Sequence, residues 1–162
     1  AAEAALIIHD TLADLNIRSW VKTSGATGLQ IYIPVGERYS YDQARALNEF
    51  FGRYFSKKYP RIFTIERTVK KRGTKLYFDY LQMWTGKTII APYSPRATKQ
   101  ASVSAPLEWE ELKQGIDPAH LNLRTIGQRL KSKGDLFSPL LEPTTVQNLD
   151  FILKSISSTS KY

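Results

Sequence analysis

The spacing of apolar residues changes along the first part of the chain, and this change limits the folds that the chain can adopt. Between residues 2 and 15, apolar side chains recur at helical spacing, which predicts an amphipathic helix. Residues 17–22 and 29–35 are instead short runs rich in β-branched and aromatic side chains, as in strands, and the turn-forming residues 23–28 separate them. The chain therefore begins as a helix followed by strand, loop and strand.

Later segments predict more helices and strands in irregular order. Ser40 and Gln43 have the spacing of a capping box, which starts a helix over about residues 41–57, and Thr144 with Gln147 is a second candidate of the same kind. Asp117 followed by Pro118 is a further helix start. The other expected elements are strands at 62–66 and 75–81, a basic turn at 70–73, helices at 108–114, 117–133 and 144–156, and a frayed end over 155–162.

The order of these elements indicates the fold class. Strands and helices interleave without the regular alternation of a doubly wound parallel sheet, which favours an α+β fold with a mixed or antiparallel sheet and flanking helices. A length of 162 residues corresponds to about one domain. We expect residues 1–141 to form its main part and residues 142–162 to add a C-terminal helix and tail.

Composition excludes several classes of protein. Without cysteine there is no disulfide framework or thiolate metal site, and His9 and His120 alone make a zinc site improbable, so we interpret both histidines as structural or exposed. No apolar run approaches the roughly 20 residues that cross a bilayer. The chain is therefore expected to be cytoplasmic, with no membrane partner.

Positive charge is concentrated in one stretch of the chain. Lys and Arg number 23 against 15 Asp and Glu, for a net charge of +8. Residues 57–75 contain eight of these basic residues and a single acid, Glu66. Such clustering favours a strip that faces phosphates, although a hairpin with solvent-facing lysines would have the same composition.

Two local features could carry chemistry. The loop at residues 24–28 offers hydroxyls, small residues and accessible backbone N–H groups, which together can hold a phosphate, but a structural β-turn has the same makeup. Asp79 lies within the apolar and aromatic run 76–81, where an ionised carboxylate is costly unless it meets a metal ion, a base or a set of hydrogen bonds. Pairing with a nearby arginine is the structural alternative.

Several ordered motifs resemble one enzyme family. They are Lys22 to Pro34, Asp79 to Gln82, Gly86 to Thr88, Ala91 to Arg96, Val103 to Trp109 and Gly134 to Phe137. Together they are similar to the polymerase domain of bacterial ligase D, a member of the archaeo-eukaryotic primase superfamily that acts in non-homologous end joining of DNA breaks. Gln30 and Tyr32 suggest a Bacillus-like member. The resemblance implies a primase-polymerase-type sheet with flanking helices, and a protein associated with the bacterial nucleoid.

The resemblance also implies roles for single residues. Ser24 matches the serine that hydrogen-bonds the triphosphate of the incoming nucleotide, and Gln30 stands where the family usually has a histidine with the same contact. Asp79 matches a catalytic aspartate that coordinates Mn²⁺ or Mg²⁺. Arg72 and Arg96 match arginines that engage nucleotide phosphates. Lys70 and Lys71 would then border the DNA.

The expected partners are DNA ends, nucleoside triphosphates, Ku and the ligase domain of the same protein. The family's Asp-x-Asp pair, which supplies two of the metal carboxylates, does not occur in this sequence and by the family's spacing would precede Ala1. We therefore expect an N-terminally truncated part of the polymerase domain that is inactive alone. Two alternatives stay open: a non-enzymatic module that binds DNA or a repair protein through its basic strip, and a relative of the replicative primases.

Overall fold

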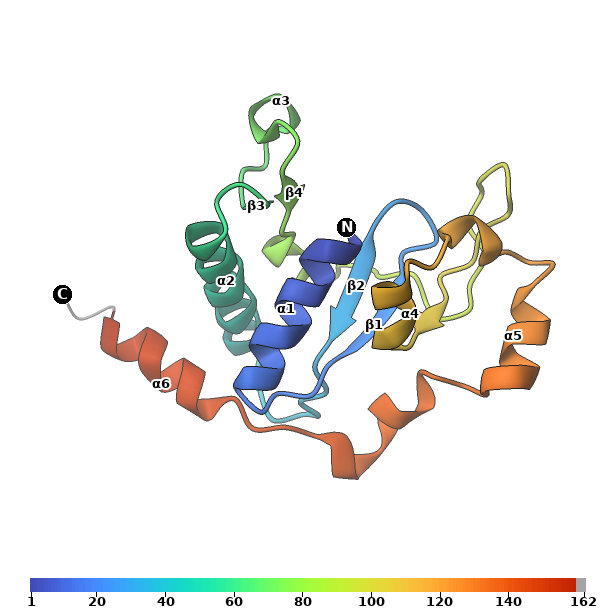
Figure 1. Ribbon diagram of the computed structural model, residues 1–162. Coiled ribbons are helices and arrows are strands. Elements are labelled where there is room, and N and C mark those ends of the chain that lie inside the picture. The colour runs from blue at the N-terminus through green and yellow to red at the C-terminus, as the bar shows by residue number, and fades with distance from the viewer. Residues whose placement is uncertain (160–162) are drawn as a thin grey trace. The chain divides into compact units, whose positions relative to one another are not determined.

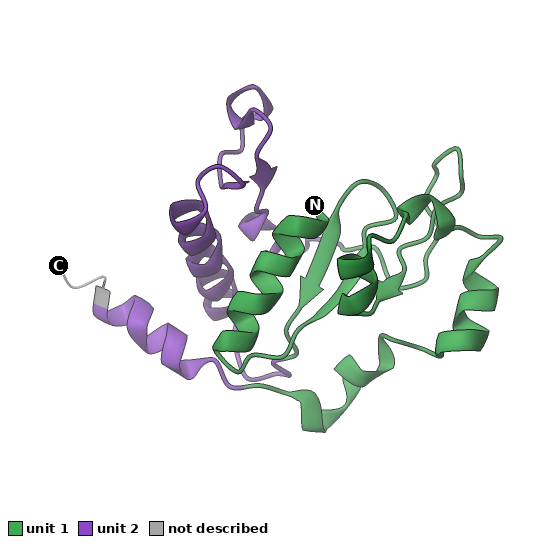
Figure 2. Ribbon diagram, viewed as in Figure 1, with its two compact units in different colours: residues 1–34, 89–147 green, residues 35–88, 148–162 purple. Residues whose placement is uncertain are grey.

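The computed structural model describes residues 1–159, which form two compact units from interleaved segments (Figures 1 and 2). Unit 1 consists of Ala1–Pro34 and Ile89–Gln147, and unit 2 of Val35–Thr88 and the segment from Asn148 onward. A small antiparallel sheet with flanking helices confirms the expected α+β class. The division of one polymerase domain at residue 141 stays a prediction. Within the described range, no helix is long and apolar enough to cross a membrane.

The sheet of unit 1 is a short antiparallel one in the order β2-β1-β5. Lys22 of β1 lies opposite Gln30 of β2, and Val21 lies opposite Leu107 of β5. Helices α1 and α4 pack against each other, and α1 also contacts β2 (Figure 1). The bounds are α1 Ala2–Asp14, β1 Trp20–Thr23, β2 Leu29–Tyr32, β5 Pro106–Leu107 and α4 Trp109–Gln114.

The core of unit 1 forms on one face of this sheet. Val21 packs with Ala5 of α1 and Leu112 of α4, and partly buried side chains such as Ile31 extend the cluster. Because successive strand residues point to opposite faces, Lys22 and Gln30 lie on the face away from this cluster. The register therefore places two polar side chains together, at the end of β1 that leads into the loop at 24–28.

The helix expected over 117–133 is wrong in its first half. Asp117 does cap a turn, because its carboxylate accepts from Ala119 N at 2.9 Å, but this turn is only the 3-10 helix η2 (Pro118–His120). Asn122 accepts from Arg124 N through its side chain, and such local bonds compete with helical ones. Helix α5 therefore begins later, and it is tied to α4 by the Arg129–Glu111 ion pair of 2.5 Å. Its bounds are Ile126–Lys133.

The helix expected over 144–156 is present but begins later, at Asp150, because the side chain of Gln147 is bonded elsewhere. Its Oε1 accepts from Arg18 N at 2.6 Å and its Nε2 donates to Arg18 O at 2.7 Å, so Gln147 cannot close a capping box. The 3-10 helix η4 lies at Thr144 instead, η3 precedes it, and the last helix, α6, belongs to unit 2. The fraying expected from residue 155 is wrong as far as Thr159, because α6 continues to that residue, and residues 160–162 lie outside the described range. The bounds are η3 Ser138–Leu141, η4 Pro143–Thr145 and α6 Asp150–Thr159.

Unit 2 is built around α2. The capping box is present as predicted, since Ser40 Oγ accepts from Gln43 N and Gln43 Oε1 accepts from Ser40 N. Phe55 is fully buried among aromatic rings, and α2 also packs against α6 and β3. The bounds are α2 Tyr41–Lys58, β3 Phe63–Thr64, α3 Val69–Arg72, β4 Leu76–Tyr77 and η1 Tyr80–Gln82.

The two strands of unit 2 are shorter than the sequence suggests, and they pair in parallel, with Phe63 opposite Leu76. The expected basic turn at 70–73 is the one-turn helix α3, which ends at Gly73. It lies at the end of the β3–β4 arm that points away from α2 (Figure 1). Lys70 and Lys71 are exposed there, and the preceding residue, Val69, is 73% exposed.

Candidate functional site

The loop between β1 and β2 closes on the hydroxyl of Ser24. Ser24 Oγ accepts from Ala26 N at 3.2 Å and from Gly28 N at 3.1 Å, while Ser24 N donates to Gly28 O at 2.9 Å. The loop is therefore a closed turn, in agreement with the alternative that residues 24–28 form a structural turn. The hydroxyl proton of Ser24 is still available as a donor, because both of these contacts use the oxygen as acceptor.

Gly25 brings Arg96 onto this loop. Its φ is +71°, in the left-handed region, and a Cβ built there would lie 2.4 Å from Arg96 Cγ and 3.0 Å from Ser104 N. The stem of Arg96 thus crosses Gly25 where a side chain would otherwise be. Among the residues that the structure describes, the exposed Arg96 guanidinium makes no hydrogen bond or ion pair. A cation without a partner is left beside the Ser24 hydroxyl loop.

We expect Gly25→Ala to destabilise the chain by about 1–3 kcal/mol, because it combines a strained left-handed φ with a close approach to the backbone of Ser104. Gly28→Ala is the matched control, since its Cβ would meet Ser24 Oγ at an ordinary 3.6 Å. Urea unfolding followed by circular dichroism measures both. Equal unfolding free energies for the two variants would contradict this account of the loop.

A buried lysine that the sequence did not reveal lies beside this loop. The side chain of Lys22 is fully buried, and its Nζ donates to Gln30 Oε1 at 2.5 Å, to Ser104 Oγ at 2.5 Å and to Ile90 O at 2.9 Å. Burial, and secondly the positive charge of Arg96, lower the pKa of Lys22 to about 8. The sequence could have indicated this contact, because a hairpin over the two predicted strands places Lys22 opposite Gln30.

Asp79 is exposed and lies after the end of β4, immediately before η1. The expectation of a buried acid inside a strand is therefore wrong. The apolar run misled because β4 ends at Tyr77, and it is Phe78 that packs on the ring of Phe55. Asp79 lines a cavity of about 270 Å³ in unit 2. The other lining residues are Arg67, Arg72, Tyr77, Leu81, Gln82 and Lys87.

Arg72 is held in place at this cavity. Its Nε donates to Glu66 O at 2.8 Å, its Nη2 donates to Arg67 O at 2.7 Å, and its guanidinium lies 3.9 Å from the centre of the Tyr77 ring. Burial, together with the carboxylate of Asp79, raises the pKa of Tyr77, so the phenol keeps its proton at neutral pH. With three cations against one acid, the charge of the lining suits an anion.

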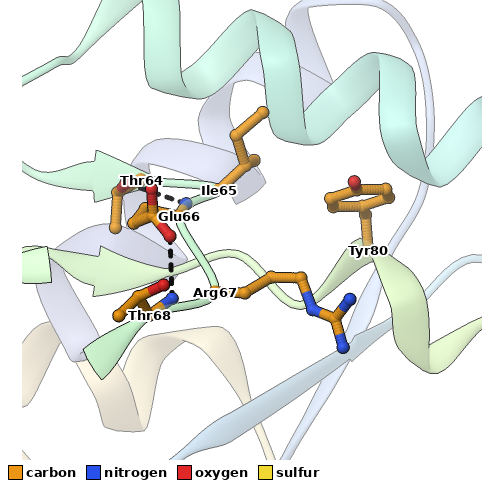
Figure 3. Close-up of a pocket in the computed structure, with 6 residues that line it drawn as sticks. All are labelled: Thr64, Ile65, Glu66, Arg67, Thr68 and Tyr80. Carbon is orange, nitrogen blue, oxygen red and sulfur yellow. Dashed lines mark hydrogen bonds between the residues drawn. The ribbon is translucent and has the colours of Figure 1, made fainter. Parts of the chain in front are cut away.

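A second, larger cavity of about 790 Å³ lies next to the turn after β3 (Figure 3). Arg67 lines both cavities and extends toward Tyr80 in this one. Glu66 is turned aside, because its Oε1 accepts from Thr68 N at 2.8 Å. The complete lining is Thr64, Ile65, Glu66, Arg67, Thr68 and Tyr80.

The residues present do not form a metal site by themselves. In the part of the chain that the structure describes, no three His, Cys, Asp or Glu side chains lie close enough together to hold an ion. Asp79 could contribute one carboxylate, whereas two-metal sites hold ions about 3.5–4 Å apart and need several. A two-metal site would therefore need carboxylates in addition to Asp79.

The predicted site residues fall into two groups. Ser24, Gln30 and Arg96 lie in unit 1, and Arg72 and Asp79 line one cavity of unit 2. Lys70 and Lys71 are not among the lining residues of either cavity. Sequence reasoning assigned no role to Lys22, Arg67, Gln82 or Lys87, although Arg67 lies in the basic stretch and the other three lie in the motifs quoted above.

Comparison with known proteins identifies a primase-polymerase-type protein. Residues 1–137 match the family described as LigD, primase-polymerase domain. The chain belongs to this family, and the relatives named below are non-homologous end joining proteins.

Named relatives agree with this assignment. The bifunctional non-homologous end joining protein LigD of Bacillus subtilis is 36% identical over 99% of the chain, which spans 26% of that protein's length, in line with the expected Bacillus-like character. The multifunctional LigD of Mycolicibacterium smegmatis is 30% identical over 98% of the chain, which spans 21% of it. The solved polymerase domain of Mycobacterium tuberculosis ligase D in complex with DNA has a TM-score of 0.77 and 34% identity, covering 86% of this chain and 48% of that one.

Proposed function

We propose that this chain is the nucleotide-binding part of a repair polymerase domain that adds nucleotides to broken DNA ends before ligation. The proposal depends on Arg96, whose stem packs on Gly25 in the Ser24 hydroxyl loop and whose guanidinium has no bonded partner among the described residues. A planar guanidinium and a hydroxyl donor suit the oxygens of a triphosphate. In unit 2, Arg72 is oriented by Tyr77 and two carbonyl oxygens and is a separate candidate for binding an anion.

Catalysis in this proposal needs metal-binding carboxylates in addition to that of Asp79. Asp79 is one ligand for Mn²⁺ or Mg²⁺, and the ion would act as a Lewis acid on the phosphate oxygens. The sequence holds no Asp-x-Asp pair, and the chain spans about half of the solved polymerase domain. We therefore propose that the chain alone binds nucleotide without extending DNA, and that further carboxylates come from the longer domain.

DNA ends are the proposed macromolecular partner. The basic stretch of residues 57–75 lies entirely in unit 2, and its exposed lysines Lys70 and Lys71 on α3 are suited to DNA phosphates. The related polymerase domain was solved with DNA. Ku and a ligase domain of the same protein are proposed as further partners, by analogy with the end-joining role of the relatives.

One alternative has a specific observation in its favour. A non-enzymatic DNA-binding module would need only the exposed lysines of α3 and the surrounding basic stretch, and would make no use of the Ser24 loop. It predicts salt-sensitive DNA binding with no affinity for nucleotides. Nucleotide affinity therefore separates the two functions.

Isothermal titration of the chain with ATP and with dATP tests the proposal. We expect binding of at least one of them, and a loss of about tenfold in affinity for Arg96→Ala, which removes one charged phosphate contact worth about 1.5 kcal/mol. Arg124→Ala is the matched control, because Arg124 is also exposed in unit 1 and its side chain has no bonded partner in the described structure. DNA binding without nucleotide binding would favour the module.

A further inference from the structure

Lys22 is the most deeply buried ionisable group near the proposed nucleotide loop, and it lies directly across the β1–β2 ladder from Gln30. A lysine ammonium has three N–H donors, and each has an acceptor here: Gln30 Oε1, Ser104 Oγ and Ile90 O. No carboxylate is among these partners. Lys22 therefore does not serve to neutralise an acid.

The bond network continues beyond the amine to fix the strand end. Ser104 Oγ accepts from Lys22 and donates to Thr23 O at 2.7 Å, while Thr23 Oγ1 donates to Val103 O at 3.0 Å. The Lys22 amine is thus anchored to the buried Ser104 hydroxyl, which Thr23 O holds in turn, and to the carbonyl oxygen of Ile90. Its third partner, Gln30, is half-buried, so it is the one side chain of the set that reaches toward solvent.

The contact determines which way the Gln30 amide faces. An ammonium can donate only to the carbonyl oxygen of an amide, so the Oε1 atom of Gln30 is directed at Lys22 and the Nε2 atom away from it. Within residues 1–159, Gln30 Nε2 has no hydrogen-bond partner. Two N–H donors are therefore left unused on the same strand that leaves the Ser24 loop.

We propose that Lys22 is a positioning residue that turns the Gln30 amide so that its NH₂ group donates to a phosphate of a bound nucleoside triphosphate. The inference rests on the proposed function, because it names the ligand that the Gln30 donors meet. Lys22 acts through Gln30 and not by touching the ligand, since its three donors are already used. The neutral glutamine thereby presents only donors to an anion.

Nuclear magnetic resonance of the side-chain amide of Gln30 tests the positioning without any nucleotide. Its signals are assigned by their loss in Gln30→Leu. We expect them to shift in Lys22→Met and, in the wild-type chain, to titrate near pH 8 as the amine loses its charge, because burial and Arg96 lower the pKa of Lys22 to about 8. Lys131→Met, a change of an exposed lysine, leaves them unmoved. Unchanged signals in Lys22→Met would overturn the positioning role.

A double-mutant cycle on ATP binding tests whether Lys22 acts through Gln30. We expect Lys22→Met and Gln30→Leu each to weaken binding by about tenfold, and the double variant to be no weaker than either. A double variant about 100-fold weaker would overturn the proposal, because independent effects add in free energy. If Lys22→Met does not fold by circular dichroism, Ser104→Ala, which removes one acceptor of the amine, replaces it in the cycle and in the resonance experiment.

The two measurements separate this inference from the function on which it rests. If wild-type chain binds neither ATP nor dATP, the proposed function fails, and the resonance experiment still decides whether Lys22 orients Gln30. If nucleotide binds but the effects of Lys22→Met and Gln30→Leu add, the proposed function stands and the positioning role is refuted.

Discussion

Asp79→Ala, tested in the longer polymerase domain that we propose for catalysis, is expected to lower nucleotide addition at least about 100-fold. Loss of a residue that only supports a metal ligand costs 10–100-fold, so loss of a proposed ligand itself should cost no less. Among the described residues, Asp79 is the only acid that lines its cavity, beside Arg67, Arg72 and Lys87. Its removal leaves those cations in place, and DNA affinity should change little. Extension of a primed DNA end with Mn²⁺, and fluorescence anisotropy for DNA affinity, measure the two effects.

Asp14→Ala serves as the control for this experiment. Asp14 is an exposed aspartate in the last turn of α1, in unit 1, and lines neither cavity. The Asp14→Ala variant should extend a primed DNA end at the wild-type rate. Extension at the wild-type rate in Asp79→Ala would refute the metal-ligand role and leave the carboxylate as a structural neighbour of Tyr77.

Phe55→Ala should destabilise unit 2 by about 3–5 kcal/mol, the usual cost of removing a fully buried phenyl ring. The ring centre of Phe55 lies 5.4 Å from that of Phe63 and 6.1 Å from that of Phe78, so its loss opens a cavity between α2 and the β3–β4 arm. Urea denaturation monitored by circular dichroism measures the change. Because Phe78 immediately precedes Asp79, the variant should also weaken phosphate binding at the cavity of about 270 Å³ that Asp79 and Arg72 line.

Phe151→Ala on α6 provides the comparison, since the same side chain is removed where it is 47% exposed. A loss below about 1 kcal/mol is expected for it. Similar losses in the two variants would mean that the aromatic cluster around Phe55 is not the main stabilising core of unit 2.

Local sequence motifs predicted the start of a helix where the capping residues bond only to each other. α2 begins where Ser40 and Gln43 predict, because a capping box involves only neighbouring residues. The same motif failed at Thr144, because the side chain of Gln147 bonds to Arg18, far away in sequence. A spacing rule cannot show that one of its members is occupied by a distant partner.

The candidate site was predictable to a similar degree. The hydroxyl loop at Ser24 follows from its composition, but the packing of Arg96 onto Gly25 depends on contacts between distant segments. Lys22 escaped notice because lysine is rarely buried, and only the hairpin register brings it opposite Gln30. Asp79 was placed inside a strand because hydrophobicity alone cannot tell a strand from the loop that follows it.

The interleaving of the two units restricts how this protein can be dissected. The backbone passes from one unit to the other after Pro34, after Thr88 and after Gln147, so neither unit corresponds to an uninterrupted stretch of the gene. A fragment that stops at residue 147 would strip α6 from α2, and excising residues 35–88 would cut unit 1 into two separate peptides. A stand-alone version of either unit therefore requires a redesigned connection, such as a circular permutant, and simple trimming is not sufficient.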